Sequence, residues 1–136
     1  MTTFPDEAVV PVDCGSCPPG ATATVSETIA YGRLHWSRHH ACTDGPVLEC
    51  GRDEPPPEVR QALLDQCGVF RLRLSGITSR VTVMKVLRER GTALSDVAAM
   101  LTALADQGVP GTEMELRLLS MRLDGAGVIT LSRECP

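Results

Sequence analysis

The sequence is poor in aromatic residues, and it has neither a long apolar run nor an excess of basic charge. It holds two phenylalanines, one tyrosine and one tryptophan among 136 residues, so its core has to be built from aliphatic side chains and methionine. No run approaches the roughly 20 apolar residues that a membrane-spanning helix needs. The first residues, MTTFPDEAVVPVDC, lack the basic start and apolar stretch of a secretory signal. We therefore expect a cytoplasmic protein without a membrane partner.

The charge balance points away from nucleic acids. The formal net charge is −4, so there is no basic footprint for phosphate backbones. A mildly acidic surface would suit a basic protein partner, but simple solubility is the favoured interpretation of this charge. Hydrophobic residues make up 43% of the chain and charged residues 22%, which is a normal globular composition. A folded protein without a nucleic-acid partner is the expectation.

Six cysteines stand out against this background. Thiols stay reduced in the cytosol, so clustered cysteines favour metal ligation over a disulfide framework. Cys14 and Cys17 form a Cys-x-x-Cys with a glycine inside, which is the shape of a zinc knuckle. One such pair supplies only half of a tetrahedral site.

The rest of the site is expected from a β-hairpin that follows. Residues 22–30 and 33–41 are rich in strand-forming types, and Tyr31-Gly32 can provide the turn. Cys42 comes next. This order, in which a cysteine pair is followed by a hairpin and then by a second group of ligands, is the layout of a zinc ribbon. The fourth ligand is open: His39 has knuckle-like spacing to Cys42, His40 is adjacent, and Cys50 lies further on.

Three interpretations of the cysteines compete. In the first, a structural zinc ion is bound by Cys14, Cys17, Cys42 and one of His39, His40 or Cys50. In the second, a degenerate ribbon has lost its metal and is held by packing or a disulfide. In the third, the cysteines are unrelated and buried. A catalytic zinc would need an open position and a neighbouring acid or base, and no spacing selects one, so we expect no enzyme.

The C-terminal part predicts an α+β domain. The pattern predicts a first strand over residues 69–74 and a last strand over 128–131. Between them it predicts three helices, over 79–90, from 92 and from 112. Helices in this order would cover one face of a small sheet. The stretch GRDEPPP marks a boundary, followed by a short helix from Glu58 to about Gln66. The expected domains are 1–54, a cysteine-rich hairpin module, and 55–136, which includes this helix.

The second domain resembles a known family. The stretch RVTVMKVLR at residues 80–88, ALSDV at 93–97 and the DGAGV turn at 124–128 are similar to the C-terminal domain of the bacterial ribosomal stalk protein L7/L12. In that family the first helix bears a basic and apolar surface that engages translation GTPases. The resemblance implies that Arg80, Lys85 and Arg88 would form such a surface.

The whole chain also resembles immunity proteins of actinobacterial polymorphic toxin systems. The residues that carry this likeness are Gly32, Arg33, Trp36, His40 and Cys42. It implies a non-catalytic protein that binds and neutralises a toxin domain, with a deaminase-like toxin as one candidate. The alternatives are an adaptor that binds a GTPase factor and a zinc-dependent enzyme. Candidate toxin contacts are the hairpin residues and an acidic stretch: Tyr31, His35, Trp36, Asp44, Glu49, Asp53 and Glu54. The oligomeric state is left open.

Overall fold

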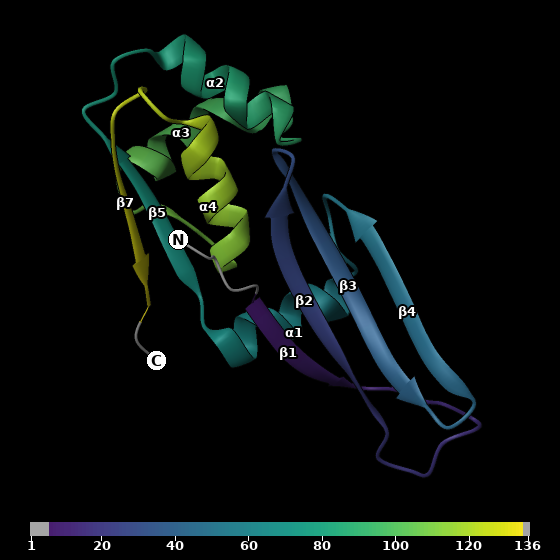
Figure 1. Ribbon diagram of the computed structural model, residues 1–136. Coiled ribbons are helices and arrows are strands. Elements are labelled where there is room, and N and C mark those ends of the chain that lie inside the picture. Colours follow the sequence, from purple (N-terminus) through teal and green to yellow (C-terminus); the bar gives the residue numbers. More distant parts are fainter. Residues whose placement is uncertain (1–5, 135–136) are drawn as a thin grey trace. The chain divides into compact units, whose positions relative to one another are not determined.

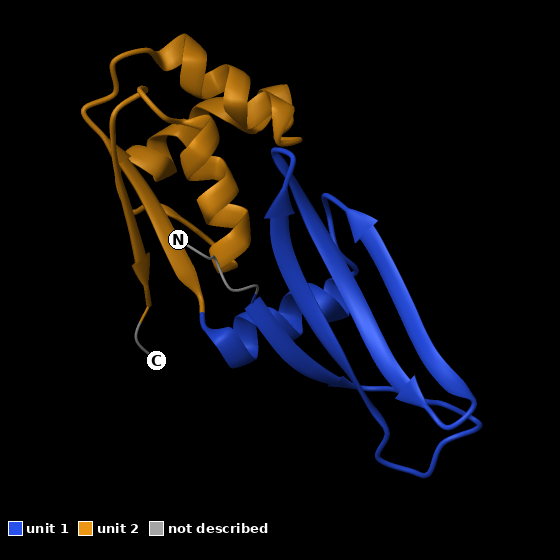
Figure 2. Cartoon of the chain, viewed as in Figure 1, with its two compact units in different colours: residues 1–68 blue, residues 69–136 orange. Residues whose placement is uncertain are grey.

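A computed structural model describes residues 6–134 of the protein (Figure 1). These residues form two antiparallel sheets and four α-helices, which confirms the expected α+β class. The chain divides into two compact units, Met1–Gly68 and Val69–Pro136 (Figure 2). No helix within residues 6–134 has the length and apolar character needed to cross a membrane.

Unit 1 is a four-stranded meander with one helix. Its strands are β1 (Asp6–Pro11), β2 (Thr22–Ala30), β3 (Arg33–Cys42) and β4 (Gly45–Arg52), and they lie in the order β1-β2-β3-β4. The predicted hairpin is β2 and β3, and β4 continues the meander beyond it. Tyr31 and Gly32 both have positive φ, 53° and 71°, which gives the tight turn a twist that matches the strands.

The first sheet is covered on one face by α1 (Pro57–Cys67). Alternate residues of β1 and β2 point to this face, because side chains in a strand alternate with a period of two. The resulting core contains Ala8, Val10, Ala23 and Val25 from the strands and Val59, Ala62 and Leu63 from the helix. The sequence predicts a boundary after residue 54 and groups this helix with the second domain. The structure packs it in unit 1, since its apolar face closes the first core.

Unit 2 contains three short strands and three helices. The chain runs through β5 (Phe70–Ser75), α2 (Arg80–Glu89), a 3₁₀ turn (Leu94–Asp96), α3 (Val97–Ala105), β6 (Val109–Gly111), α4 (Glu113–Arg122) and β7 (Val128–Arg133). The strand order is β6-β5-β7, and all pairings are antiparallel. The expected pairing of the first and last strands is confirmed, whereas the three-residue strand β6 was not predicted.

The core of unit 2 lies between one face of this sheet and its helices. Leu72 and Leu74 of β5 are wholly buried, and they pack with leucines and valines from all three helices. Arg71 and Arg73 alternate with them and point to the other face of the sheet. The core is aliphatic, as the scarcity of aromatic residues requires.

Helix α4 begins with a complete capping box. The Thr112 hydroxyl accepts from the Glu115 N–H at 3.2 Å, and the Glu115 carboxylate accepts from the Thr112 N–H at 3.1 Å. Two backbone donors of the first turn are thereby satisfied reciprocally. Thr112 is only 1% exposed, so water cannot replace the hydroxyl without rearrangement.

Replacing Thr112 by Ala is expected to lower the free energy of unfolding of unit 2 by about 1 kcal/mol, because a buried N-cap acceptor is lost. The measurement is urea denaturation followed by circular dichroism. Thr102→Ala is the matched control, since its hydroxyl bonds only to the Ala98 carbonyl within an exposed stretch of α3. Equal effects of the two substitutions would contradict the capping role.

Candidate metal centre

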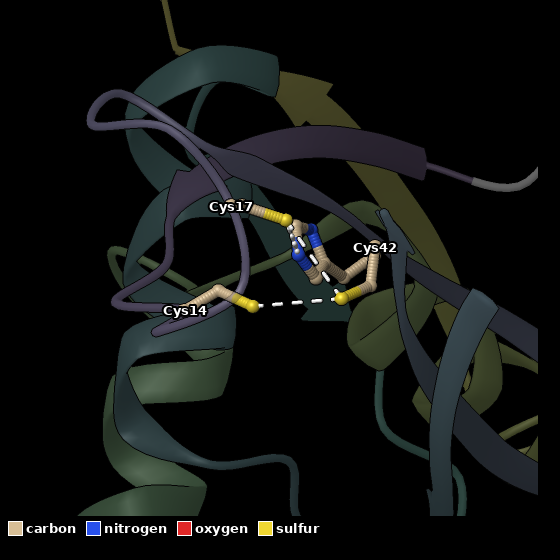
Figure 3. Close-up of side chains that lie close together, drawn as sticks. Cys14, Cys17 and Cys42 are labelled. Carbon is tan, nitrogen blue, oxygen red and sulfur yellow. Dashed lines mark hydrogen bonds between the residues drawn. The ribbon is translucent and has the colours of Figure 1, made fainter. Parts of the chain in front are cut away.

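Four potential metal ligands gather at one end of the first sheet. The ligand atoms of Cys14, Cys17, His40 and Cys42 all lie within 4.8 Å of one another. Cys14 Sγ is 3.6 Å and Cys17 Sγ is 3.8 Å from Cys42 Sγ, and Cys17 Sγ is 3.4 Å from His40 Nε2. Figure 3 shows the thiols of Cys14, Cys17 and Cys42 pointing toward one another. The group could bind a metal ion.

Two of these ligands come from the end of β3. His40 and Cys42 are two residues apart in the strand, so they project from the same face of the sheet. His39, which the sequence analysis included in the ligand set, projects from the opposite face and is exposed. Spacing along the chain favoured His39, but the alternation of the strand selects His40.

The other two ligands come from the loop between β1 and β2. The Cys17 N–H donates to the Cys14 carbonyl at 3.2 Å, which closes a turn and brings both thiols to one side. The hydroxyl of Thr43, in the β3–β4 turn, donates to the Ser16 carbonyl at 2.6 Å. The loop is thus tied directly to the turn that follows the other two ligands.

The His40 ring is oriented by a backbone carbonyl. Its Nδ1 lies 2.9 Å from the Thr22 carbonyl oxygen, which can only accept, so Nδ1 carries the proton. The lone pair of the neutral ring is then on Nε2, which faces the thiols. Metal-bound histidines are commonly held in this way by a backbone oxygen. The Thr22 carbonyl, and after it the Cys17 thiol, raise the pKa of His40.

The thiols have unequal acidity. The pKa of Cys17 is lowered from 9.0 to about 7, chiefly by the backbone N–H of Thr43, with His40 contributing and burial opposing. The Asp44 N–H lowers the pKa of Cys42, but hydrogen bonds with Cys14 and Cys17 and burial outweigh it, so this pKa is raised. Cys17 is therefore deprotonated at a lower pH than Cys42. The resulting thiolate is the form that binds metals.

The remaining described cysteines lie outside the cluster. Cys50, also in the predicted ligand set, is exposed in β4 and pairs with Ser37 in the middle of the sheet. It is separated from the cluster because β4 runs away from the turn that holds Cys42. Cys67 donates from Sγ to the Glu7 carbonyl at 3.2 Å, beside α1.

The hairpin residues predicted to contact a partner lie on different faces. Tyr31 is 100% exposed at the β2–β3 turn. Trp36 faces the α1 side of the sheet and packs over Gly51, where an added Cβ would lie 2.6 Å from the indole nitrogen. His35 projects from the opposite face, and its Nε2 donates to the Ala30 carbonyl at 3.1 Å. The structure therefore does not join them into one aromatic and histidine surface.

The predicted acidic stretch is also divided. Asp44 lies in the β3–β4 turn beside the metal cluster, whereas Asp53 lies beyond the far end of β4 and forms an ion pair with Arg33. Glu49 lies in β4, between these two residues in the sequence, and its carboxylate forms an ion pair with the Arg38 guanidinium at 3.3 Å. Glu54 is exposed in the segment after β4. In unit 2, the basic residues predicted from the stalk-protein resemblance are all exposed on α2: Arg80, Lys85 and Arg88.

In metal-free protein, Cys17 is expected to react with iodoacetamide with a midpoint at about pH 7, because only the thiolate is alkylated. Mass spectrometry of peptides from samples alkylated at a series of pH values measures the midpoint. His40→Asn removes a hydrogen bond that favours the thiolate, so it should move the midpoint upward. A wild-type midpoint near the ordinary value of 9.0 would contradict the arrangement.

Comparisons of the chain with protein-family models, with curated proteins and with solved structures found no match.

Proposed function

We propose that Cys14, Cys17, His40 and Cys42 bind one structural zinc ion, and that the chain is a non-catalytic protein-binding module held in shape by this ion. The observation that carries the proposal is the convergence of four ligand atoms within 4.8 Å. Three thiols and one imidazole are a donor set that zinc prefers, because thiolate and imidazole suit this borderline-soft cation.

The distances between the ligand atoms support a tetrahedral ion. Zinc–sulfur bonds of about 2.3 Å set tetrahedral sulfur–sulfur edges of about 3.8 Å, and a sulfur–nitrogen edge of about 3.6 Å. The distances from Cys42 Sγ to the other two sulfurs are 3.6 and 3.8 Å, and the distance from Cys17 Sγ to His40 Nε2 is 3.4 Å. The ligands need little movement to close on an ion of this size.

The number of ligands favours a structural role over catalysis. A catalytic zinc keeps one position open for water or substrate, whereas four protein ligands fill a tetrahedral shell. Such an ion joins the loop between β1 and β2 to the end of β3. Its binding contributes directly to folding, because the ligands converge only when the sheet has formed.

The first test is metal content. Wild-type protein purified without chelator is expected to contain one zinc ion per chain, measured by elemental mass spectrometry, and His40→Ala and Cys42→Ser should lose it. His39→Ala and Cys50→Ser are matched controls, since both residues are exposed in the same sheet but outside the cluster. Zinc loss in the controls, or full zinc content in the cluster variants, would refute the site.

The second test is stability. Adding zinc at 1,000 times its dissociation constant should stabilise the folded state by about 4 kcal/mol, because zinc is bound only by the assembled ligands. The melting temperature should therefore rise with zinc and fall when a chelator is added. Cys42→Ser should show no response to either reagent, while Cys50→Ser should respond like the wild type. A melting temperature that is independent of zinc would exclude a structural ion.

For the partner, the resemblance to immunity proteins keeps a toxin domain as the leading candidate. Supporting it is Tyr31, whose side chain is entirely exposed although its backbone has a positive φ that tyrosine seldom adopts. Tyrosines in rigid, exposed positions are frequent binding anchors. We expect Tyr31→Ala to weaken capture of the partner in a pull-down from the host, and partners are identified by mass spectrometry.

A GTPase factor of translation is the second candidate. It is supported by the surface of α2, where Val81 is 76% exposed among exposed Arg80, Lys85 and Arg88. In the same pull-down, the double variant Lys85→Glu/Arg88→Glu should then lose the partner while Tyr31→Ala retains it. The opposite pattern favours the toxin interpretation.

A further inference from the structure

The two edges of the first sheet are treated differently. On the outer edge of β1, the Gln66 side chain of α1 accepts from the Val9 N–H at 2.9 Å and donates to the Val9 carbonyl at 2.7 Å. Cys67 adds a bond to the Glu7 carbonyl at 3.2 Å. The helix thus occupies the hydrogen-bonding groups that a further strand would need. Proteins commonly block edge strands in such ways, because an open edge pairs with other chains.

The other edge is β4, and its outward groups can be identified. The Asp53 N–H donates to the Leu34 carbonyl at 2.7 Å, so Asp53 faces β3. Because hydrogen-bonded and non-bonded residues alternate in an antiparallel pair, Leu48, Cys50 and Arg52 direct their N–H and C=O groups outward. Within residues 6–134, no partner bonds to these outward groups.

Side chains do not shield this edge either. Every residue from Pro46 to Cys50 is exposed, including Val47 at 46% and Leu48 at 65%. Pro46 also lies at an outward position and has no N–H to donate, but its carbonyl can still accept. An eight-residue edge with exposed apolar side chains is a site for adding a strand.

We propose that two copies of this chain pair through β4, antiparallel and centred on Leu48, to form a symmetric dimer with one continuous sheet. The Leu48 residues of the two copies then exchange backbone hydrogen bonds across the twofold axis. The Cys50 N–H of each copy meets the Pro46 carbonyl of the other, and the Cys50 carbonyl, for which proline has no N–H, is left to water at the exposed edge. The inference does not depend on which partner protein the module binds.

Charge and side-chain character select this register. Centring on Leu48 places leucine beside leucine at the axis, and it sets Asp44 of each copy opposite Arg52 of the other, so that two acid–base pairs close the interface. Centring on Glu49 would place two carboxylates directly opposite each other, which is destabilising. Centring on Cys50 would set Val47 against Asp53. The register at Leu48 also sets Val47 against Glu49, but of the three it alone combines an apolar pair at the axis with two acid–base pairs.

The first experiment is light scattering with size-exclusion chromatography over a range of protein concentrations. Zinc-loaded wild-type protein should change from the mass of one chain to twice that mass as its concentration rises. Leu48→Lys should stay monomeric, because it places like charges at the twofold axis. His39→Lys is the matched control, since His39 is exposed on the same face, directly opposite Leu48 in β3, but away from the edge. It should dimerise like the wild type.

A charge exchange tests the register. Asp44→Arg and Arg52→Asp should each weaken the dimer by about tenfold, because each turns two attractive contacts into repulsive ones. The double variant Asp44→Arg/Arg52→Asp should restore the wild-type dissociation constant. Zinc content of every variant is measured in parallel, so that damage to the metal centre is distinguished from loss of pairing.

Each outcome of these experiments supports or overturns either the pairing or its register. A wild-type protein that is monomeric at every concentration, or a Leu48→Lys variant that dimerises normally, would overturn the proposal. Additive effects of the two charge reversals, with no restoration in the double variant, would overturn the register centred on Leu48. A normal zinc content in those cases would leave the structural zinc site intact.

Discussion

The alternation of side chains along β3 is the constraint on which unit 1 depends. One face of the strand carries Trp36, Arg38, His40 and Cys42, and the other carries His35, Ser37 and His39. The first set continues the face that packs on α1 and ends in the metal cluster. A slip of one residue in the pairing would exchange the two faces, removing the ligands from the cluster and placing His39 in the core-facing row. The register of one strand therefore links the apolar core to the candidate metal centre.

The cluster of three cysteines and His40 shows how a small sheet can hold a loop without a large core. Ten residues between β1 and β2 contribute little apolar surface, and their order derives from polar contacts: Cys17 to Cys14, Thr43 to Ser16, and Val12 N–H to the Ala21 carbonyl at 3.0 Å. The Thr43 N–H lowers the pKa of the Cys17 thiol, and the Asp44 N–H opposes the net rise in the pKa of the Cys42 thiol. The proposed zinc ion would add strong metal–ligand bonds to this network of hydrogen bonds. The same turn that positions the ligands thereby helps to stabilise their charged form.

The two edges of the first sheet differ in whether α1 covers them. Gln66 uses one amide to satisfy both backbone groups of Val9, so α1 closes the core and caps an edge at the same time. Within residues 6–134, no side chain bonds to the outward backbone groups of β4 in this way. Helix α1 packs its apolar face on β1 and β2, and β4 lies at the other edge of the sheet. This asymmetry is the basis for the proposed pairing of two chains through β4.

The sequence by itself determined most of the helices and strands and three of the four residues of the cluster. Alternating strand residues, the Tyr31-Gly32 turn and the Thr112 capping box are local signals, and each corresponds to the element found. Cys14, Cys17 and Cys42 were identified because thiols at knuckle spacing have a specific chemistry. Only the tertiary structure decided the choice of His40 over His39 and Cys50, since it depends on which face of β3 meets the cysteine loop. It also decided that α1 belongs to unit 1, because an amphipathic helix carries no signal for which of two sheets its apolar face will cover.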